Sequence, residues 1–336
     1  MNIDISHITI PAEFDSLSDI YLPVEDLTSG VIYPGPRSIA ELPDYLDVLQ
    51  FILKECKKID KVDFSLHLYH EKRKIIFRVH VIESLDGKIY DLRKLSTKIP
   101  DIKQLGYRDN YTELLLSEKL NNGGLIIMCG ETGQGKSTTA AASICYRLKK
   151  YGSFCLTIED PVEIPLQGFY PGENGKTGVC YQTQVSEEGI EEAIKGALRS
   201  YPSVSNSILF LGEIRSSAMA NEVLKIAANG HLVFSTMHGF DLISSIERFV
   251  QMASSHKNTK KEEVISMFSL VFRLAIHQKL IRQSNGTRKV DPKVIFSSSP
   301  VSNVANRIKT GNVQLLATDI EQQNMMLKQG RSILQM

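Results

Sequence analysis

Residues 130–137 combine three glycines with a lysine and a serine at the spacing G-x-x-x-x-G-K-S. In such a loop the glycines let backbone N–H groups turn toward phosphate. The lysine neutralises charge on the β and γ groups, and the serine hydroxyl ligates magnesium. The spacing therefore predicts a phosphate-binding loop for ATP and Mg²⁺. Its expected nucleotide-binding residues are Gly130, Thr132, Gly133, Gln134, Gly135, Lys136, Ser137 and Thr138.

The surroundings of this loop match what its mechanism needs. An apolar run at 125–129 comes before it and a helical run follows, so the loop is expected to join a strand to the start of a helix. The alternative, a glycine-rich turn that binds nothing, is disfavoured by this context.

Acidic residues follow two other apolar runs. Phosphoryl transfer needs carboxylates at the ends of neighbouring strands, where they serve the magnesium ion and the attacking water. Glu213 follows the run at 208–211 and is the candidate for orienting the magnesium shell, through water. The run at 154–158 is followed by Glu159, Asp160 and Glu163. An isolated acid is more often a helix cap or a surface residue, but the phosphate loop favours the catalytic interpretation.

The elements that must hold these residues are indicated by hydrophobic spacing. Apolar runs at 125–129, 154–158, 208–211 and 232–236 alternate with longer helical stretches. This alternation is typical of a mostly parallel sheet covered by helices. We therefore predict an α/β domain over residues 106–336, while the tail after Ile320 carries no readable signature.

Residues 1–105 are expected to form a smaller α+β domain with a linker. Strand-like alternation runs through 74–82, and apolar residues recur at helical spacing from Asp44 to Lys58. The connector at 99–106 contains Pro100 and Gly106, which marks the boundary between the two domains.

Composition and charge exclude several classes of protein. Hydrophobic residues make up 42% of the 336 residues and charged residues 23%, which is ordinary for a folded soluble protein. The net charge is +1, from 39 basic and 38 acidic residues, so no bulk attraction to nucleic acid or to an acidic membrane is expected.

Cysteine usage and hydropathy indicate a cytoplasmic protein. The five cysteines are scattered and form no C-x-x-C pair, which disfavours a disulfide framework and a structural zinc site. The N-terminus has no basic region followed by an apolar run, and no eighteen apolar residues follow one another. Any membrane association is therefore expected to come through a partner.

Four sequence blocks, in this order, resemble the secretion-ATPase superfamily, which powers type IV pili and type II and type IV secretion. The blocks at 130–137, 159–163, 211–215 and 230–238 are similar to its Walker A, Asp box, Walker B and His box. Further similarity lies at 18–21, 77–81 and 93–102, and residues 277–281 resemble the family's "QrLv" helix. The resemblance covers residues 16–283.

The resemblance implies a fold and roles for single residues. The fold is a C-terminal RecA-like P-loop NTPase domain with a smaller N-terminal α+β (PAS-like) domain. Glu163 would polarise the attacking water, and Ser137 and Glu213 would hold the magnesium ion, Glu213 through water. The implied catalytic residues are Glu163, Glu213, Lys136, His238 and His231, with the two histidines sensing the nucleotide. The candidate arginine fingers or sensors are Arg78, Arg93, Arg199 and Arg215.

This sequence also departs from the family pattern. It has residues 182–185 as Gln-Thr-Gln-Val where Gln-Arg-Glu-Val is common, and Ser203 where the family has aspartate after a proline. Its His box ends Met237-His238-Gly239 in place of Leu-His-Thr. Without a paired C-x-x-C insertion, the chain is most similar to PilT-like retraction ATPases and DotB-like type IV secretion ATPases.

The resemblance implies a motor. A homohexamer would convert ATP hydrolysis into movement of the N-terminal domains and pass force to an inner-membrane platform protein of a pilus or secretion machine. Such a protein would be cytoplasmic and peripheral to the inner membrane. A nucleic-acid-dependent RecA-type ATPase is disfavoured by the neutral charge and the absence of tryptophan. A nucleotide-gated scaffold that does not hydrolyse ATP is the remaining alternative.

Overall fold

The computed structural model describes residues 2–71, 73–172, 175–186, 189–202, 207–257, 259–283 and 288–334. The chain divides into two compact units. The first comprises Met1–Lys98 and Pro161–Pro165, and the second comprises Ile99–Asp160 and Leu166–Met336.

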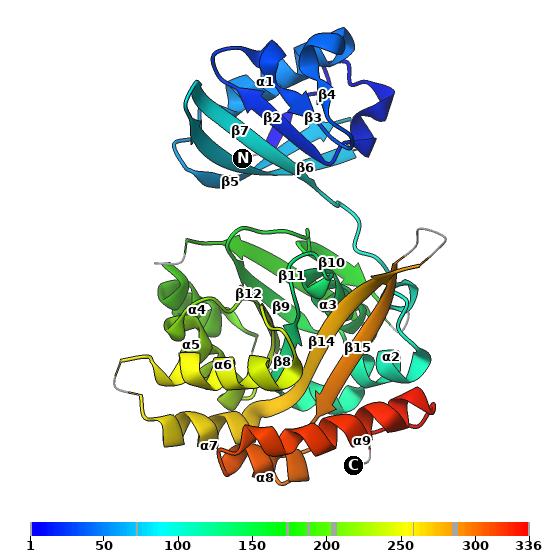
Figure 1. The fold of residues 1–336 in the computed structure, drawn as a ribbon, viewed down its shortest axis with the longest axis vertical. Helices are drawn as coiled ribbons and strands as arrows, with labels where there is room; N and C mark the ends of the chain where they lie inside the picture. Colours follow the sequence, from blue (N-terminus) through cyan, green and yellow to red (C-terminus); the bar gives the residue numbers. More distant parts are fainter. Residues whose placement is uncertain are drawn as a thin grey trace. The chain divides into compact units, whose positions relative to one another are not determined.

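The first unit is built on a seven-stranded sheet in the order β1-β5-β6-β7-β2-β3-β4 (Figure 1). All neighbours are antiparallel except β1 and β5, which pair in parallel. Its strands are β1 (Asn2–Asp4), β2 (Asp19–Pro23), β3 (Val31–Ile32), β4 (Arg37–Ser38), β5 (Asp63–His70), β6 (Arg73–Ser84) and β7 (Gly87–Leu95).

One α-helix packs on this sheet, α1 (Leu46–Cys56), after a short 3-10 turn at Pro43–Tyr45. Helical spacing places Val48, Leu49 and Ile52 on one face, and all three are fully buried in the core of the unit. The predicted helix from Asp44 to Lys58 thus exists, although its first turn is 3-10.

The second unit contains an eight-stranded sheet in the order β10-β11-β9-β12-β13-β8-β14-β15. The six central strands run parallel, and β10 and β15 close the two edges as antiparallel hairpin partners. The strands are β8 (Gly124–Cys129), β9 (Phe154–Glu159), β10 (Gly168–Pro171), β11 (Thr177–Gln184), β12 (Ser207–Glu213), β13 (Leu232–Met237), β14 (Phe272–Arg282) and β15 (Arg288–Phe296).

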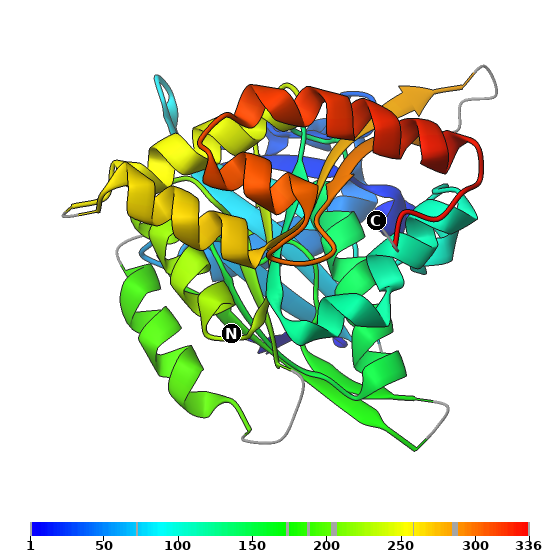
Figure 2. The ribbon, with the colours of Figure 1, turned by 90° about the horizontal axis from the view of Figure 1, so that it is seen from below.

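The helices of the second unit cover both faces of this sheet. They are α2 (Asp109–Leu116), α3 (Lys136–Tyr151), α4 (Ile190–Ser200), α5 (Ser217–Ala228), α6 (Leu242–Ser254), α7 (Lys261–Val271), α8 (Asn303–Lys309) and α9 (Leu316–Lys328). Helices α7, α8 and α9 pack on one another in sequence (Figure 2). In the described part of the chain no helix has the length and hydropathy needed to span a bilayer.

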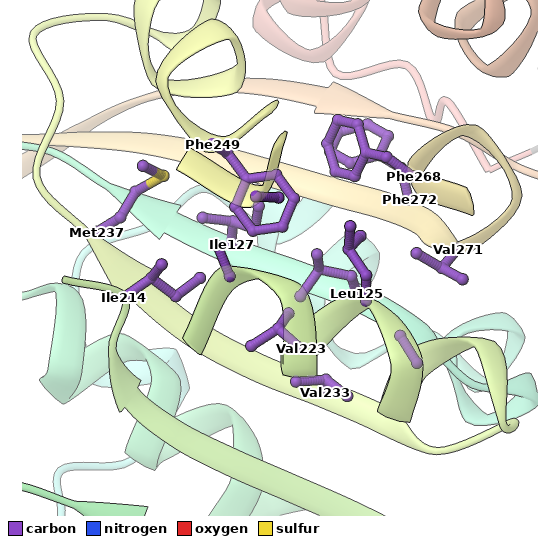
Figure 3. Close-up of a cluster of buried hydrophobic side chains, with 14 of the residues drawn as sticks. Leu125, Ile127, Ile214, Val223, Val233, Met237, Phe249, Phe268, Val271 and Phe272 are labelled. Atoms are coloured by element: carbon purple, nitrogen blue, oxygen red, sulfur yellow. The ribbon is translucent and has the colours of Figure 1, made fainter. Parts of the chain in front are cut away.

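The core explains why the central strands form continuous apolar runs. Every residue of β8 and of β13 is buried, as expected for parallel strands with helices on both faces. Figure 3 shows part of this core, where Leu125 and Val233 meet Val223 of α5, Phe249 of α6 and residues of α7.

Two segments of the second unit differ from or extend the sequence analysis. The expected "QrLv" helix at 277–281 is wrong, because these residues belong to strand β14, which pairs in parallel with β8. Residues Leu316–Lys328 form α9, although the tail carries no sequence signature. Its buried Asn324 side chain donates to the carbonyl of Val294 (2.7 Å) and accepts from its N–H (3.0 Å), which satisfies backbone groups of the edge strand β15.

Candidate active site

The phosphate loop joins the end of β8 to the start of α3. Gly130 follows β8 with φ of 141°, and Gly135 precedes α3 in the left-handed conformation, with φ of 79°. These backbone conformations favour glycine, because a Cβ atom there would be strained. The loop therefore has the shape that its glycine spacing predicts, with the first turn of α3 pointing its N–H groups into it.

The side chain of Lys136 binds backbone carbonyls of its own loop. Its side chain is buried, and Nζ donates to the carbonyl oxygens of Gly130 (2.9 Å) and Glu131 (2.8 Å). An ammonium held on two carbonyls can exchange these partners for phosphate oxygens, since all of them are hydrogen-bond acceptors. Ser137 and Thr138 are half-buried in the first turn of α3.

Strand pairing brings the Walker B and His box residues to the same sheet edge as the loop. Cys129, the last residue of β8, pairs with Met237 of β13, so His238 and Gly130 both leave the sheet at this level. On the other side of β13, Thr236 pairs with Glu213. The carboxyl ends of parallel strands thus assemble the site, as is usual in open α/β sheets.

A bulge in β12 sets the position of Glu213. The pairing with β13 shifts between Leu211 and Glu213, which leaves Gly212 as the extra residue. Ser235 Oγ donates to the carbonyl of Leu211 (2.5 Å), and Thr236 Oγ1 donates to that of Gly212 (3.1 Å). The two hydroxyls therefore satisfy the backbone groups that the bulge releases from the ladder.

Glu213 lies between two basic side chains. Its Oε2 accepts from Nε of Arg215 (2.9 Å) and lies 2.8 Å from Nη2 of the same guanidinium. Its Oε1 lies 2.8 Å from Nε2 of His238. The Glu213 side chain is only 17% exposed, whereas that of Arg215 is 51% exposed.

A second carboxylate ends the neighbouring strand β9. Glu159 is buried, and Gln182 of β11 donates to its Oε1 through Nε2 (2.9 Å). The side-chain oxygen Oε1 of Gln182 in turn accepts from the N–H groups of Leu166 (2.7 Å) and Gln167 (2.9 Å). Gln182, which agrees with the family pattern, therefore ties the end of β9 to the segment before β10, and the departures at 183 and 184 follow it on β11. Ser203, another departure from that pattern, lies outside the described residues.

Glu163 and two of the candidate arginines belong to the first unit. Glu163 lies in Pro161–Pro165, and its Oε1 is 3.8 Å from Nη1 of Arg78 on β6. Arg78 pairs across the strands with Arg93 of β7, whose Nε donates to Asp19 (2.8 Å).

The two arginines are part of a charged pocket of the first unit. It is lined by Asp63, Arg78, His80, Asp91 and Arg93. Burial raises the pKa of Asp91, whereas the hydrogen bond to Asp19 raises the pKa of Arg93. The pocket thus gathers two guanidinium groups beside the carboxylates of Asp63 and Asp91.

Within the second unit, two of the predicted site residues lie away from the carboxyl edge of the sheet. His231 precedes β13 at its amino end, where its Nδ1 lies 2.6 Å from Ser207 Oγ and its ring lies on that of Tyr201. Six residues of β13 separate it from His238, which amounts to about 20 Å of strand. Arg199 lies exposed in the last turn of α4. The sequence block holds both histidines, but the strand between them sends them to opposite edges of the sheet.

The sequence analysis assigned no role to a polar cluster behind the phosphate loop. Gln278 of β14 is 2% exposed and accepts hydrogen bonds from Tyr107 and Thr139. Beside it, burial lowers the pKa of His277, which pairs in register with Cys129. The signal available in the sequence was a glutamine within an apolar run. It was overlooked because residues 277–281 were expected to form a helix.

The residues present fit a nucleoside triphosphate with a divalent cation. Positive-φ glycines, a helix N-terminus and Lys136 converge on one loop, and the Glu213 carboxylate leaves the same sheet edge. The fold and this site define a P-loop ATPase built on a RecA-like sheet.

The family follows from comparison with known proteins. Residues 57–332 match the family described as "Type II/IV secretion system protein", and the chain belongs to it. It is 28% identical to "Type IV pilus retractation ATPase PilT" of Pseudomonas aeruginosa over 262 residues, covering 77% of this chain and 70% of that protein. It is also 28% identical to "Twitching motility protein" of Neisseria gonorrhoeae, over 75% of this chain and 62% of the relative. The match to "Uncharacterized protein YggR" of Escherichia coli is 30% identical and covers 74% and 71%.

Solved structures agree with this placement. The pilus retraction motor PilT with bound ADP superposes with a TM-score of 0.70 at 25% identity, covering 94% of this chain and 87% of that one. The ATPase DotB of Legionella pneumophila shares the fold, with a TM-score of 0.64 at 19% identity and coverage of 94% and 89%. PilT and DotB are ATPases, and this chain belongs with them.

Proposed function

We propose that this protein hydrolyses ATP with magnesium and works as a homohexameric motor for a type IV pilus or a conjugation-related type IV secretion machine. The observation that carries the proposal is the convergence at one sheet edge. The phosphate loop after β8, Glu213 after the β12 bulge and His238 after β13 all leave the sheet there. The similarity to PilT and DotB supports the kind of machine.

Each residue at this edge has a role in the proposal. Lys136 and the first turn of α3 bind the phosphates, and Ser137 and Glu213 hold the magnesium ion, Glu213 through water. When bound, the ion neutralises charge that develops on the transferring phosphoryl group. Lys136 moves from its carbonyl partners to the phosphates. His238 contacts Glu213 Oε1, and its proposed role is to sense the nucleotide through that carboxylate.

Glu163 is proposed to polarise the attacking water. The similarity of residues 159–163 to the Asp box of the family supports this role. Arg78 and Arg93 are proposed to stabilise transition-state charge on a neighbouring subunit, and their adjacency on β6 and β7 supports a joint action. Arg215 pairs with Glu213 of its own chain, so its proposed role is to orient that carboxylate.

The proposed partner is an inner-membrane platform protein, at the cytoplasmic face of the membrane. Direct nucleic-acid binding is not part of the proposal. Stimulation of hydrolysis by single-stranded DNA would favour the RecA-type alternative over a pilus or secretion motor.

The proposal is tested by magnesium-dependent ATP hydrolysis of the wild type and of Glu163→Gln, with light scattering after size exclusion in the presence and absence of nucleotide. We expect a hexameric wild type that turns over. The variant should bind ATP but hydrolyse it at least about a hundredfold more slowly, because it lacks the base. A wild type that binds ATP without hydrolysing it at any oligomeric state would instead support the nucleotide-gated scaffold.

A further inference from the structure

Behind the phosphate loop lies a buried polar network centred on Gln278 of β14. Gln278 is 2% exposed, and its partners Thr139 and Tyr107 are 1% and 7% exposed. Buried polar groups of this kind are costly unless each finds a partner. Burial correspondingly raises the pKa of Tyr107, which keeps its hydroxyl protonated as a donor.

The two hydroxyls fix the orientation of the Gln278 amide. Tyr107 donates to Oε1 at 2.6 Å, and Thr139 donates to the same oxygen at 2.8 Å. With the oxygen occupied by two donors, the Nε2 group faces the phosphate loop, where it donates to the carbonyl of Gln134 at 2.5 Å. A flipped amide would place its oxygen against the carbonyl oxygen of Gln134, where neither atom can donate, so one orientation is favoured.

Gln134 is also held from its other side. Its side-chain Oε1 accepts from the N–H of Leu280, two residues after Gln278 on β14, at 2.6 Å. One strand therefore binds both the backbone and the side chain of the same loop residue. This double attachment fixes the middle of the loop relative to the sheet.

Gln278 also explains two of the motif glycines. A Cβ atom on Gly130 would lie 2.6 Å from the Gln278 carbonyl oxygen, and one on Gly135 would lie 2.9 Å from its Nε2. The residue thus contacts the loop at its first glycine, at Gln134 and at its last glycine. Glycine is required at both ends partly because β14 approaches so closely.

We infer that Gln278, oriented by Tyr107 and Thr139, is a positioning residue for nucleotide binding. It holds the phosphate loop in the conformation that turns its N–H groups toward phosphate, so less ordering remains to be done when the nucleotide binds. Gln278 acts through Gln134 and is not proposed to touch the nucleotide. The inference rests on the proposed nucleotide site.

The chain offers a closely matched control in Gln323 of α9. Gln323 is 3% exposed, and its amide binds the N–H (2.7 Å) and the carbonyl (2.8 Å) of Phe296. Gln323→Met and Gln278→Met therefore remove the same group from equally buried positions. Of the two glutamines, Gln278 is the one that contacts the phosphate loop.

The experiment measures the dissociation constant of a fluorescent ADP analogue with Mg²⁺, the KM and kcat for ATP, and the melting temperature of each full-length protein. We expect Gln278→Met to raise the dissociation constant and KM by roughly tenfold, with a smaller change in kcat. Gln323→Met should leave the dissociation constant and KM within about twofold of the wild type, although both variants should have lower melting temperatures. Equal weakening by the two variants, or unchanged binding by Gln278→Met, would overturn the inference.

A milder variant keeps the test independent of folding defects. Tyr107→Phe removes one hydroxyl and should weaken ADP binding by about threefold alone, but not further when Gln278 is already methionine. Additive effects of the two substitutions would show that Tyr107 does not act through Gln278. A wild type that fails to bind the analogue at all would refute the proposed nucleotide site itself, and the inference with it.

Discussion

The parallel strands of the eight-stranded sheet begin at an amino edge and end at a carboxyl edge. The two carry similar residue types, but the residues make different contacts. At the carboxyl edge, Arg215 and His238 both contact Glu213, and the two basic side chains are 51% and 42% exposed. Charged groups that are partly exposed and paired with one another can exchange partners when a charged ligand arrives. This edge therefore has the properties of a binding site.

At the amino edge, two side chains near the end of α3 donate to backbone carbonyls. Arg147, near the end of α3, is fully buried and donates through Nη2 to the carbonyls of Leu115 (3.0 Å) and Ser117 (2.9 Å). Tyr151 donates to the carbonyl of Leu116 (2.9 Å). Burial lowers the pKa of Arg147 to about 10, so it stays charged at neutral pH. A buried arginine here fastens the end of α2 and offers no surface for a ligand.

The comparison teaches that residue type alone does not identify a functional group. The direction of the strand or helix that carries the residue decides which edge it reaches. Four predictions, in order of decreasing expected effect, test this difference between the edges.

Lys136→Ala should reduce ATP turnover by about a hundredfold or more, because it removes the positive side chain that the phosphate loop itself supplies to the phosphates. Steady-state hydrolysis and nucleotide binding measure the loss. Lys149→Ala, an exposed change near the far end of the same helix, should leave turnover unaffected. Comparable losses in both variants would remove the functional distinction between the two ends of α3.

Arg147→Met should lower the free energy of unfolding by about 2 to 4 kcal/mol, because two buried carbonyls lose their charged donor. Denaturant titration measures the change, and Lys149→Met, on the same helix but exposed, should stay within about 0.5 kcal/mol of the wild type. Nucleotide affinity of the folded fraction should be unchanged. A selective loss of affinity without loss of stability would make the amino edge part of the site.

His238→Ala should lower ATP turnover by about tenfold, because Glu213 loses one of its two basic neighbours. His231→Ala should change turnover by less than about twofold, since it lies at the other edge of the sheet. The pair is a direct test, because both residues lie in one sequence block. A larger effect at His231 would show that this residue acts on the site through another chain or another route.

The smallest expected effect concerns acid stability. Burial lowers the pKa of His231 below its ordinary 6.5, so the unfolded chain binds its proton at a higher pH than the folded one. Stability should therefore fall as the pH drops through 6.5 and level off below the folded pKa. His231→Gln should flatten this part of the wild-type curve of unfolding free energy against pH. Identical curves for the two proteins would show that His231 is not held neutral by burial.

Much of the fold and part of the site could be predicted from local patterns. The apolar runs that became β8, β9, β12 and β13 were visible, because parallel strands buried on both faces need continuous apolar sequence. The phosphate loop was visible as well, because all its groups come from eight consecutive residues. The apolar run before Glu213 indicated that residue, the family resemblance added His238, and strand pairing then placed both at the edge where the loop lies.

Other features depend on contacts between distant residues, which no local pattern indicates. Part of strand β14 was mistaken for a helix, because the expectation for residues 277–281 came from a family resemblance and not from the spacing of their own side chains. The bulge at Gly212 depends on hydroxyls of β13, and the order of α9 depends on amide groups that bind the edge of β15. Each of these requires a partner distant in the chain.

The sequence by itself determined the chemistry of the loop, because its conformation follows from glycine spacing and from the strand and helix on either side. Only the tertiary structure decided which distant residues surround that loop. It inserted β8 between β13 and β14, strands that follow it much later in the chain, and so brought His238 to one side and Gln278 to the other. It also sent His231 away, because side chains at the two ends of one strand cannot reach the same sheet edge.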